Sequence, residues 1–213
     1  PKNIQSGIAD VEFTNKISLR GYRLSTEPNQ TRISEAANLL AKAERPIILA
    51  GGGVITAGAS DELIQMSDLL MAPVATTFMG KGSFPENHPL SLGSIGMHGN
   101  PAANKLIGES DVLLAVGTRF SDRATANLDS FAPNAKKIHI EIDNAEINKN
   151  IEIDIPIVAD AKKALKMLLI ATSKKLQKVE GTMWNKMVKE AKEQLSPLLK
   201  ERPKDVIPKN LLI

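Results

Sequence analysis

The 213-residue chain contains no cysteine. This absence excludes disulfide bonds, thiolate catalysis and zinc sites with cysteine ligands, and it fits a reducing compartment such as the cytoplasm. Aromatic residues make up only 3% of the chain, so we expect aliphatic side chains and methionine to fill the core. No apolar run reaches the roughly 18 residues of a membrane-spanning helix, and we therefore expect no membrane partner.

The sequence also lacks a strong charge bias and a metal-binding pattern. Lys and Arg number 27 against 24 Asp and Glu, with the two signs interspersed. No basic stripe alternates with aromatic residues, which argues against a nucleic-acid partner. The three histidines, His88, His98 and His139, lie far apart, and no pattern such as HExxH accompanies them. The sequence therefore predicts no metal site and no catalytic residue of its own.

Apolar residues make up 42% of the chain, enough for one large domain with tails. Residues 1–30 are polar and irregular, and we interpret them as a linker. Residues 31–175 alternate short apolar runs with amphipathic stretches and form the predicted domain. Residues 176–213 contain a charged helix, predicted over 182–199, and an extended tail after Pro203. The chain opens on Pro1 rather than Met, which favours a piece of a longer protein.

Five apolar runs with helix-like segments between them predict the fold class. Because these strands are apolar throughout, we expect a mainly parallel sheet of about six strands with helices on both faces, a three-layer Rossmann-like α/β domain. The runs cover residues 46–50, 72–77, 111–116, 137–143 and 155–159.

Helices are predicted from the spacing of apolar residues and from residues that commonly cap helix N-termini. Apolar spacing predicts a helix over 31–43. Ser60, Asn100 and Asp160 are each predicted to be an N-cap, with helices running to about Leu70, Ile107 and Leu169.

Glycine-rich turns follow the predicted strands, at the edge where ligands bind in parallel sheets. Gly51–Gly53 come directly after the first strand, where they either approach a ligand or make a tight bend. The dinucleotide fingerprint is incomplete because Thr56 stands where its third glycine is required. The next strand ends in Thr76 and Thr77 instead of an acid that would hold a ribose, which disfavours a conventional NAD dehydrogenase.

Two further turns predict a phosphate-bearing cofactor. Gly96–Gly99 precede a helix start, and Gly117–Arg123 follow an apolar strand. Arg119 and Arg123 either contact phosphate and a ring or form surface salt bridges with Asp122.

Other side chains in these turns leave several interpretations open. His98 either contacts the ligand or packs within its own loop. Met79 and Met97 suit packing on a flat ring. Glu141 and Asp143 accept ribose hydroxyls, face solvent or cap the following turn, and Asp160 is an N-cap, a second hydroxyl acceptor or both.

Four ordered motifs resemble the central domain of the acetolactate synthase (acetohydroxyacid synthase) family. They are KGSFPENHPLSLG at 81–93, GMHG at 96–99, GTRFSDR at 117–123 and HIEID at 139–143. The resemblance covers nearly the whole chain. It implies an intact enzyme that condenses pyruvate with pyruvate or 2-oxobutanoate, with loss of CO₂, in branched-chain amino-acid biosynthesis.

The resemblance also implies the cofactors and partners. Thiamine diphosphate and Mg²⁺ would be bound by absent flanking domains, the pyrimidine-binding domain before this chain and the pyrophosphate-binding domain after it. FAD would bind this domain, which would be catalytically inactive alone. The intact enzyme would be a homodimer or homotetramer with a small regulatory subunit. The implied FAD-binding residues are Gly51, Gly52, Gly53, Thr76, Thr77, Met79, Gly96, Met97, His98, Gly99, Gly117, Thr118, Arg119, Arg123, Glu141, Ile142 and Asp160.

Two alternatives remain open at this point. The chain is also compatible with the central domain of another thiamine-diphosphate enzyme, such as glyoxylate carboligase or a pyruvate oxidase. A stand-alone module that binds an adenine nucleotide is the alternative from a different functional class.

Overall fold

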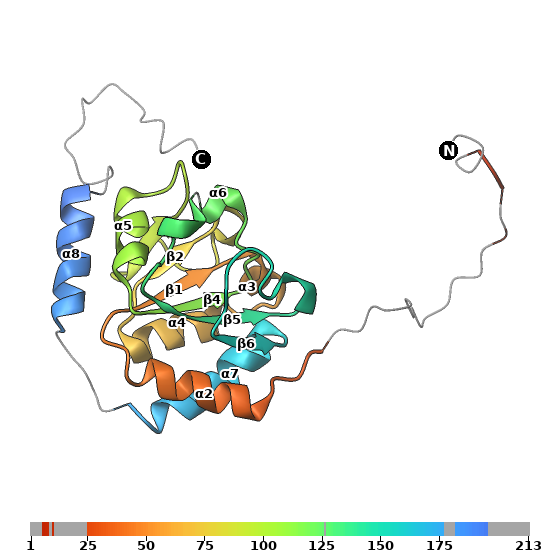
Figure 1. The fold of residues 1–213 in the computed structure, drawn as a ribbon, viewed down its shortest axis with the longest axis horizontal. Helices are drawn as coiled ribbons and strands as arrows, with labels where there is room; N and C mark the ends of the chain where they lie inside the picture. The colour runs from red at the N-terminus through yellow and green to blue at the C-terminus, as the bar shows by residue number, and fades with distance from the viewer. Residues whose placement is uncertain (1–5, 9, 11–24, 126, 177–181, 196–213) are drawn as a thin grey trace.

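The computed structural model describes residues 6–8, 10, 25–125, 127–176 and 182–195. Figure 1 shows the chain from its N-terminus in red to its C-terminus in blue. Most of the predicted linker over residues 1–30 and the predicted tail after Pro203 lie outside the described residues.

A six-stranded sheet forms the centre of the domain, and every pair of neighbouring strands is parallel. The strand order is β3-β2-β1-β4-β5-β6. This arrangement confirms the predicted α/β class. The strands are β1 (Pro46–Ala50), β2 (Val74–Thr76), β3 (Ser91–Ser94), β4 (Val112–Val116), β5 (Lys136–Glu141) and β6 (Ile155–Val158).

Helices precede, separate and follow these strands along the chain. The α-helices are α2 (Gln30–Leu40), α3 (Gly52–Thr56), α4 (Ser60–Leu70), α5 (Pro101–Glu109), α6 (Asp122–Thr125), α7 (Ala161–Ser173) and α8 (Met183–Leu195). Three short 3₁₀ helices, η1 (Phe78–Gly80), η2 (Leu128–Ser130) and η3 (Asn144–Glu146), lie in the loops.

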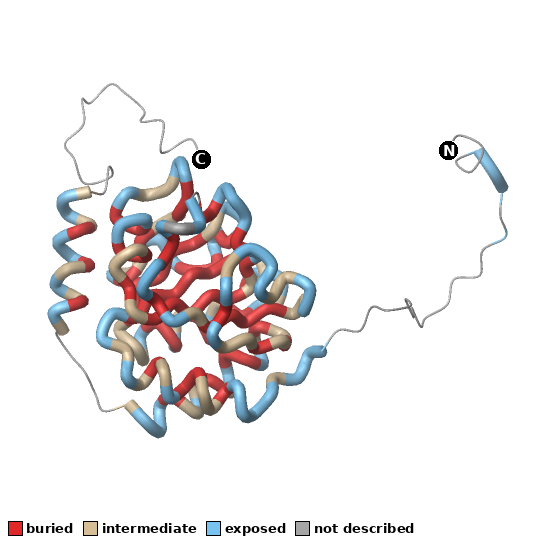
Figure 2. The backbone as a smooth tube through the Cα atoms, viewed as in Figure 1, coloured by how far each residue is buried: buried red, intermediate tan, exposed pale blue. Residues whose placement is uncertain are grey.

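The helices cover both faces of the sheet (Figure 1). Helices α2, α4 and α7 pack together on one face, and α5 and α8 pack together on the other. Successive strand residues alternate between these layers, so that Ile48 faces the first helical layer and Ile47 and Leu49 face the second. Figure 2 shows the buried strands enclosed by helices that are exposed on their outer sides.

The predicted helix caps have mixed outcomes. The side chain of Asn100 accepts a hydrogen bond from the Ala102 N–H, and that of Asp160 accepts one from the Lys163 N–H, as predicted. The prediction for Ser60 is wrong, because α4 already includes Ser60 and Ala59 is its N-cap. The physical reason is local: the Ala59 carbonyl already accepts the first helical bond from Leu63.

The sequence analysis did not predict β3, α3 or the one-turn helix α6. Strand β3 is short, contains Gly93 at φ +76° and has a register shift against β2, so it lacks an apolar run. Helix α3 begins inside the glycine turn after β1, where glycine content obscures a helical pattern.

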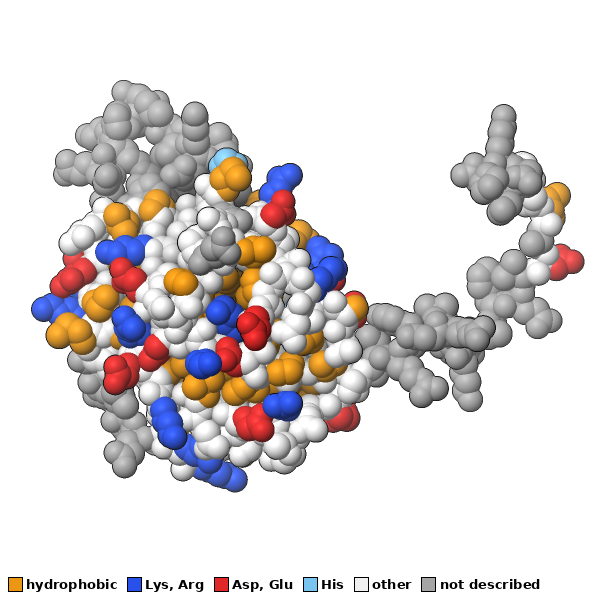
Figure 3. All heavy atoms as spheres, in the orientation of Figure 1, with side chains coloured by type: hydrophobic (Ala, Val, Ile, Leu, Met, Phe, Trp, Pro, Cys, Tyr) orange, Lys and Arg blue, Asp and Glu red, His pale blue; other side chains and the backbone are white. Residues whose placement is uncertain are grey.

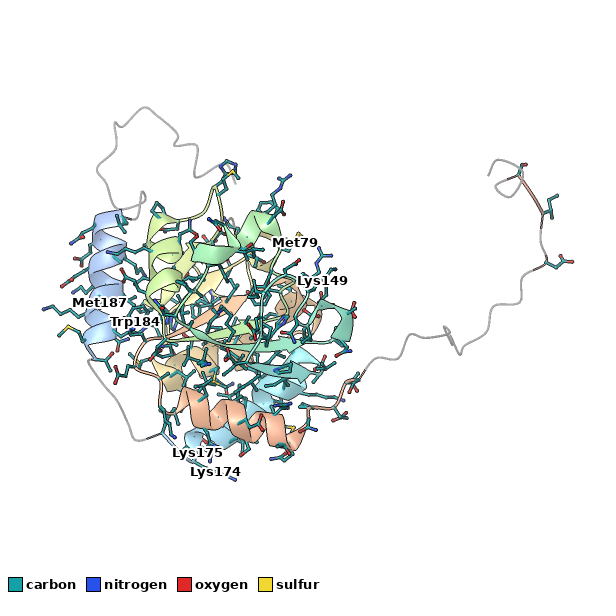
Figure 4. The ribbon with its side chains drawn as sticks, viewed as in Figure 1. Met79, Lys149, Lys174, Lys175, Trp184 and Met187 are labelled. Carbon is teal, nitrogen blue, oxygen red and sulfur yellow. The ribbon has the colours of Figure 1, made fainter. Side chains whose placement is uncertain are left out.

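Helix α8 is fastened to the starts of three strands. The Trp184 indole N–H donates to the Pro46 carbonyl at 2.9 Å, and the Asn185 amide donates to the Met71 carbonyl at 2.9 Å. The Lys192 ammonium donates to the Pro89 carbonyl at 2.6 Å. Figure 4 shows Trp184 and Met187 on α8 beside the body of the domain. Helix α8 thus packs on the same face as α5, with three side chains bonded to backbone at or just before the starts of β1, β2 and β3.

The packing of Trp184 predicts a large stability effect. Trp184 is 2% exposed, so Trp184→Ala removes a buried aromatic ring and should lower the free energy of unfolding by about 3–5 kcal/mol. Met183→Ala is the control, because Met183 is 72% exposed and its loss should cost less than about 0.5 kcal/mol. Urea unfolding followed by circular dichroism gives both values. Equal effects of the two substitutions would contradict this packing.

Candidate functional site

The sequence-predicted site residues all lie at the carboxyl-terminal edge of the sheet. Thr76 ends β2, Gly51 follows β1, and Gly117 follows β4. After β1 the chain turns into α3 on one face, whereas after β4 it turns toward α6 on the other face. In open parallel sheets, ligands bind where neighbouring connections diverge in this way.

The glycine turns after β1 and β4 touch backbone to backbone. A Cβ atom added to Gly51 would lie 2.1 Å from the Gly117 carbonyl oxygen, and one added to Gly53 would lie 2.6 Å from the Gly117 Cα atom. The Gly53 N–H donates to that same carbonyl at 3.0 Å. Gly51 and Gly53 therefore allow a close approach between the two turns, and their contact with a ligand stays a prediction.

Gly52 differs from its two neighbours. A Cβ atom added there would lie 3.2 Å from both the Met79 Cβ atom and the Met79 carbonyl oxygen, a looser contact than at Gly51 or Gly53. The Gly52 N–H has no acceptor among the described residues. Gly52 is thus the residue of this turn that remains available to a ligand.

The turn after β4 presents a row of unpaired donors. Among the described residues, none accepts a hydrogen bond from the main-chain N–H groups of Thr118, Arg119, Phe120 or Ser121. Phe120 has φ +49°, a left-handed conformation that changes the direction of the chain here. Successive N–H groups in such a turn form a concave anion-binding arrangement.

The carbonyl groups of Gly117, Thr118 and Arg119 in this turn are engaged within the protein. The Gly117 carbonyl accepts from Gly53, as described above. The Thr118 carbonyl accepts from His139 Nε2 at 2.8 Å, and the Arg119 carbonyl accepts from Asn150 Nδ2 at 2.9 Å. The turn therefore directs its acceptors into the protein and leaves its donors free.

Arg119 and Arg123 are exposed, and neither forms an ion pair with any described residue. The Asp122 carboxylate accepts from the main-chain N–H of Arg123 at 2.8 Å instead of pairing with a guanidinium. The alternative prediction, a surface salt bridge between Asp122 and Arg119 or Arg123, is therefore wrong. Helix α6 begins at Asp122, so Arg119 precedes the helix and the two arginines do not share a helical face.

The turn after β3 packs closely against neighbouring backbone and is hydrogen-bonded to the Asn104 side chain. Gly96 has φ +106°, and an added Cβ atom would lie 2.1 Å from the Arg123 carbonyl oxygen. The Asn104 amide accepts from the Gly96 N–H at 3.0 Å and donates to the Gly96 carbonyl at 2.9 Å. Gly99 is also packed against backbone, with Ile95 C 2.4 Å from an added Cβ atom. His98 is exposed and bonds to no described residue.

Large apolar side chains are exposed along the same edge. Phe78, Met79 and Met97 are 72%, 69% and 74% exposed, and Ile55 and Leu128 are about half exposed. We call these five residues the apolar rim. Figure 4 labels Met79, and Figure 3 shows apolar side chains at the upper tip of the molecule beside a histidine. Apolar groups of this size suit contact with a flat ring.

Several hydroxyl and carboxylate groups that were predicted to bind the cofactor already interact with other groups of the protein. Thr76 Oγ1 lies 3.4 Å from Ser94 Oγ, and Thr77 Oγ1 accepts from the Gly80 N–H at 3.1 Å. The Asp143 carboxylate caps η3, which was the alternative to ribose binding. Asp160 caps α7, as described above.

Glu141 lies at the end of β5, with its carboxylate next to backbone donors. It accepts hydrogen bonds from the N–H groups of Ile142 at 2.9 Å and Asp143 at 3.3 Å. Burial raises the pKa of Glu141 above its ordinary value, and these bonds oppose that effect. One carboxylate oxygen, Oε1, receives both bonds, while Oε2 lies 4.0 Å from His139 Nε2.

Sequence reasoning missed three residues that organise the site: Asn104, His139 and Asn150. Asn104 and Asn150 act on backbone that is eight and 31 residues away, so local patterns do not identify them. His139 was considered only as a metal ligand, and the described residues contain no group of three or more candidate ligands. The sequence signal that could have identified His139 is its position within an otherwise apolar strand, where a histidine requires a hydrogen-bond partner.

Within the described part of the chain, no helix has the length and apolarity needed to cross a membrane.

Comparison with known proteins identifies the family. The model described as "Thiamine pyrophosphate enzyme, central domain" matches residues 33–168. A protein of Methanocaldococcus jannaschii named "Probable acetolactate synthase large subunit" is 47% identical over 215 residues, covering 100% of this chain and 36% of that protein. An "Acetolactate synthase large subunit" of Corynebacterium glutamicum is 39% identical over 214 residues, covering 100% of this chain and 34% of that protein.

A Methanococcus aeolicus protein that carries the same name as the M. jannaschii protein is 51% identical over 172 residues, which is 79% of this chain and 29% of that protein. The chain thus spans about a third of the length of these relatives. It belongs to the thiamine pyrophosphate enzyme family, as a central domain of the acetolactate synthase-like kind.

The contact between the two glycine turns predicts a stability difference between matched substitutions. Gly117 has φ +58° and Gly58 has φ +59°, but only Gly117 lacks room for a Cβ atom. Gly58→Ala should cost about 1 kcal/mol from backbone strain alone, and Gly117→Ala at least about 2 kcal/mol more. Denaturant unfolding measures both. Equal losses would show that the turns do not pack as described.

Proposed function

We propose, on the premise that this chain is a central domain of the thiamine pyrophosphate enzyme family, that it binds FAD across the carboxyl-terminal edge of its sheet. The observation that carries this proposal is the row of N–H groups from Thr118 to Ser121, which find no acceptor among the described residues, beside Arg119 and Arg123, which form no ion pair with a described residue. Backbone donors and guanidinium groups together match the charge and geometry of a diphosphate.

The remaining predicted residues extend from this turn in two directions. Glu141, Ile142 and Asp160 lie at the ends of β5 and β6, and we assign them to the adenosine side. Gly52, Thr76 and Thr77 lie along the ends of β1 and β2, beside the middle of the cofactor. Gly96–Gly99, with Met79 and Met97 of the apolar rim, lie toward the flavin end. The proposal thus uses every strand end of the sheet.

The structure supports this assignment unevenly along the cofactor. The diphosphate end has donors and cations that pair with no residue of the described ranges, and the flavin end has exposed methionine side chains. The adenosine end has a carboxylate oxygen, Glu141 Oε2, that no backbone N–H occupies. Gly51, Gly53 and Gly117 contribute by fixing the turns instead of by approaching the ligand.

A bound FAD would supply a flavin ring, for which we propose no net redox role. We propose that the whole protein condenses two 2-oxo acids with loss of CO₂, using thiamine diphosphate and Mg²⁺ bound by flanking domains outside this chain. This chain alone would then be catalytically inactive. We also propose that the whole protein assembles as a homodimer or homotetramer with a small regulatory subunit.

Flavin titration of the whole protein tests the cofactor assignment. Arg119→Ala removes one charge-assisted contact, worth about 1.5–3 kcal/mol, and should raise the Kd for FAD at least about tenfold. Arg32→Ala is the control, because Arg32 is an exposed residue of α2 whose ion pair is with Glu35. Fluorescence titration of cofactor-free protein measures both.

Either of two results would contradict the assignment. If cofactor-free whole protein shows no saturable FAD binding, this domain does not hold FAD. If Arg119→Ala and Arg32→Ala both bind FAD as the unmodified protein does, the diphosphate does not lie at the turn after β4.

A further inference from the structure

We infer that His139 and Asn150 are positioning residues, which fix the turn after β4 so that its N–H groups face the ligand. This inference rests on the proposed function, because the ligand in question is the cofactor diphosphate. It assigns a role to two side chains that do not themselves reach the ligand.

The geometry follows from the planar trans peptide group, in which the C=O and the following N–H point in opposite directions. His139 Nε2 donates to the Thr118 carbonyl, so the Arg119 N–H of the same peptide group points away from β5. Asn150 Nδ2 donates to the Arg119 carbonyl, so the Phe120 N–H points away from the loop that carries Asn150. Two consecutive peptide planes are thereby fixed by side chains.

Packing alone does not account for a histidine at position 139. The side chain is fully buried, and its Nδ1 atom has no hydrogen-bond partner among the described residues. An unpaired buried nitrogen costs folding free energy that an apolar residue of similar size would avoid. The Phe120 ring, with its centroid 4.8 Å away, packs edge-on against the imidazole and closes it off from solvent.

The protonation state suits a donor at Nε2. Burial lowers the pKa of His139 to about 4, so the ring is neutral near pH 7. Because Nε2 faces a carbonyl oxygen, the single ring proton of the neutral form lies on Nε2. Nδ1 is then the unpaired atom, and its lost hydrogen bond is the cost of placing a donor beneath Thr118.

Asn150 contributes from a different part of the chain. It lies in the loop between η3 and β6 and is exposed, so its removal should leave the core intact. Asn144 lies in the same connection and is also exposed, but its side chain forms no hydrogen bond with a described residue. Asn144→Ala is therefore a matched control for Asn150→Ala.

The test compares ligand affinity with stability in cofactor-free whole protein. His139→Leu keeps the volume and removes the donor, whereas His139→Gln keeps a donor nitrogen at a similar reach. We expect His139→Leu to raise the Kd for FAD and for ADP about tenfold, and His139→Gln to stay within about threefold of the unmodified protein. Asn150→Ala should raise both Kd values three- to tenfold with an unchanged melting temperature, and Asn144→Ala should change neither.

Riboflavin, which carries no phosphate, separates positioning of the diphosphate from general damage. Its affinity should be equal in all four variants. Equal loss of FAD and riboflavin binding in His139→Leu and His139→Gln would show a merely structural role and overturn the inference. If His139→Leu does not fold, Asn150→Ala decides: FAD and ADP binding equal to that of Asn144→Ala would overturn the inference. Absence of FAD binding in the unmodified protein would instead overturn the proposed function itself.

Discussion

The close approach of two glycine turns is the constraint on which the rest of the candidate site depends. The turns after β1 and β4 meet at the centre of the sheet edge, where the Gly53 N–H donates to the Gly117 carbonyl. Any side chain at Gly51, Gly53 or Gly117 would occupy the space of the opposing backbone. Because both turns follow buried parallel strands, their separation is set by the spacing of the strands themselves.

That contact determines which polar groups of the turn after β4 remain available. With the Gly117, Thr118 and Arg119 carbonyls all bonded inside the protein, the N–H groups that follow have no acceptor in the part of the chain that the structure describes. Unpaired backbone donors are costly where water is excluded, and native proteins rarely leave several together. Thr118 and Phe120 are 4% and 3% exposed as whole residues, and their N–H groups are the donors for which we propose the cofactor as acceptor.

The sequence predicted the parts of this structure that depend on local patterns. Apolar runs predicted five of the six strands, because a strand pattern is a property of contiguous residues. The glycine turns lie at the carboxyl-terminal edge as expected, and a ligand site at that edge stays a prediction. Strand β3 was missed because its residues are half polar and it pairs only at the edge of the sheet. Ser60 was assigned as a cap from residue type, although the backbone begins the helix at Ala59.

The long-range contacts within the site were not predictable from residue spacing. Gly51 and Gly53 were expected to approach a cofactor, but the residue that requires them to be glycine is Gly117, more than sixty positions away. Likewise, Asn150 and His139 act on carbonyls 31 and 21 residues distant. Such contacts exist only after the strand order is set, because the sheet places β4 between β1 and β5.

The measurement that tests the central claim most directly is a crystal structure of the whole protein with FAD bound. The account predicts diphosphate oxygens within about 3 Å of the main-chain nitrogens between Thr118 and Ser121, with the His139 and Asn150 hydrogen bonds retained. A structure in which these nitrogens face water, or in which the diphosphate lies at another strand end, would contradict it.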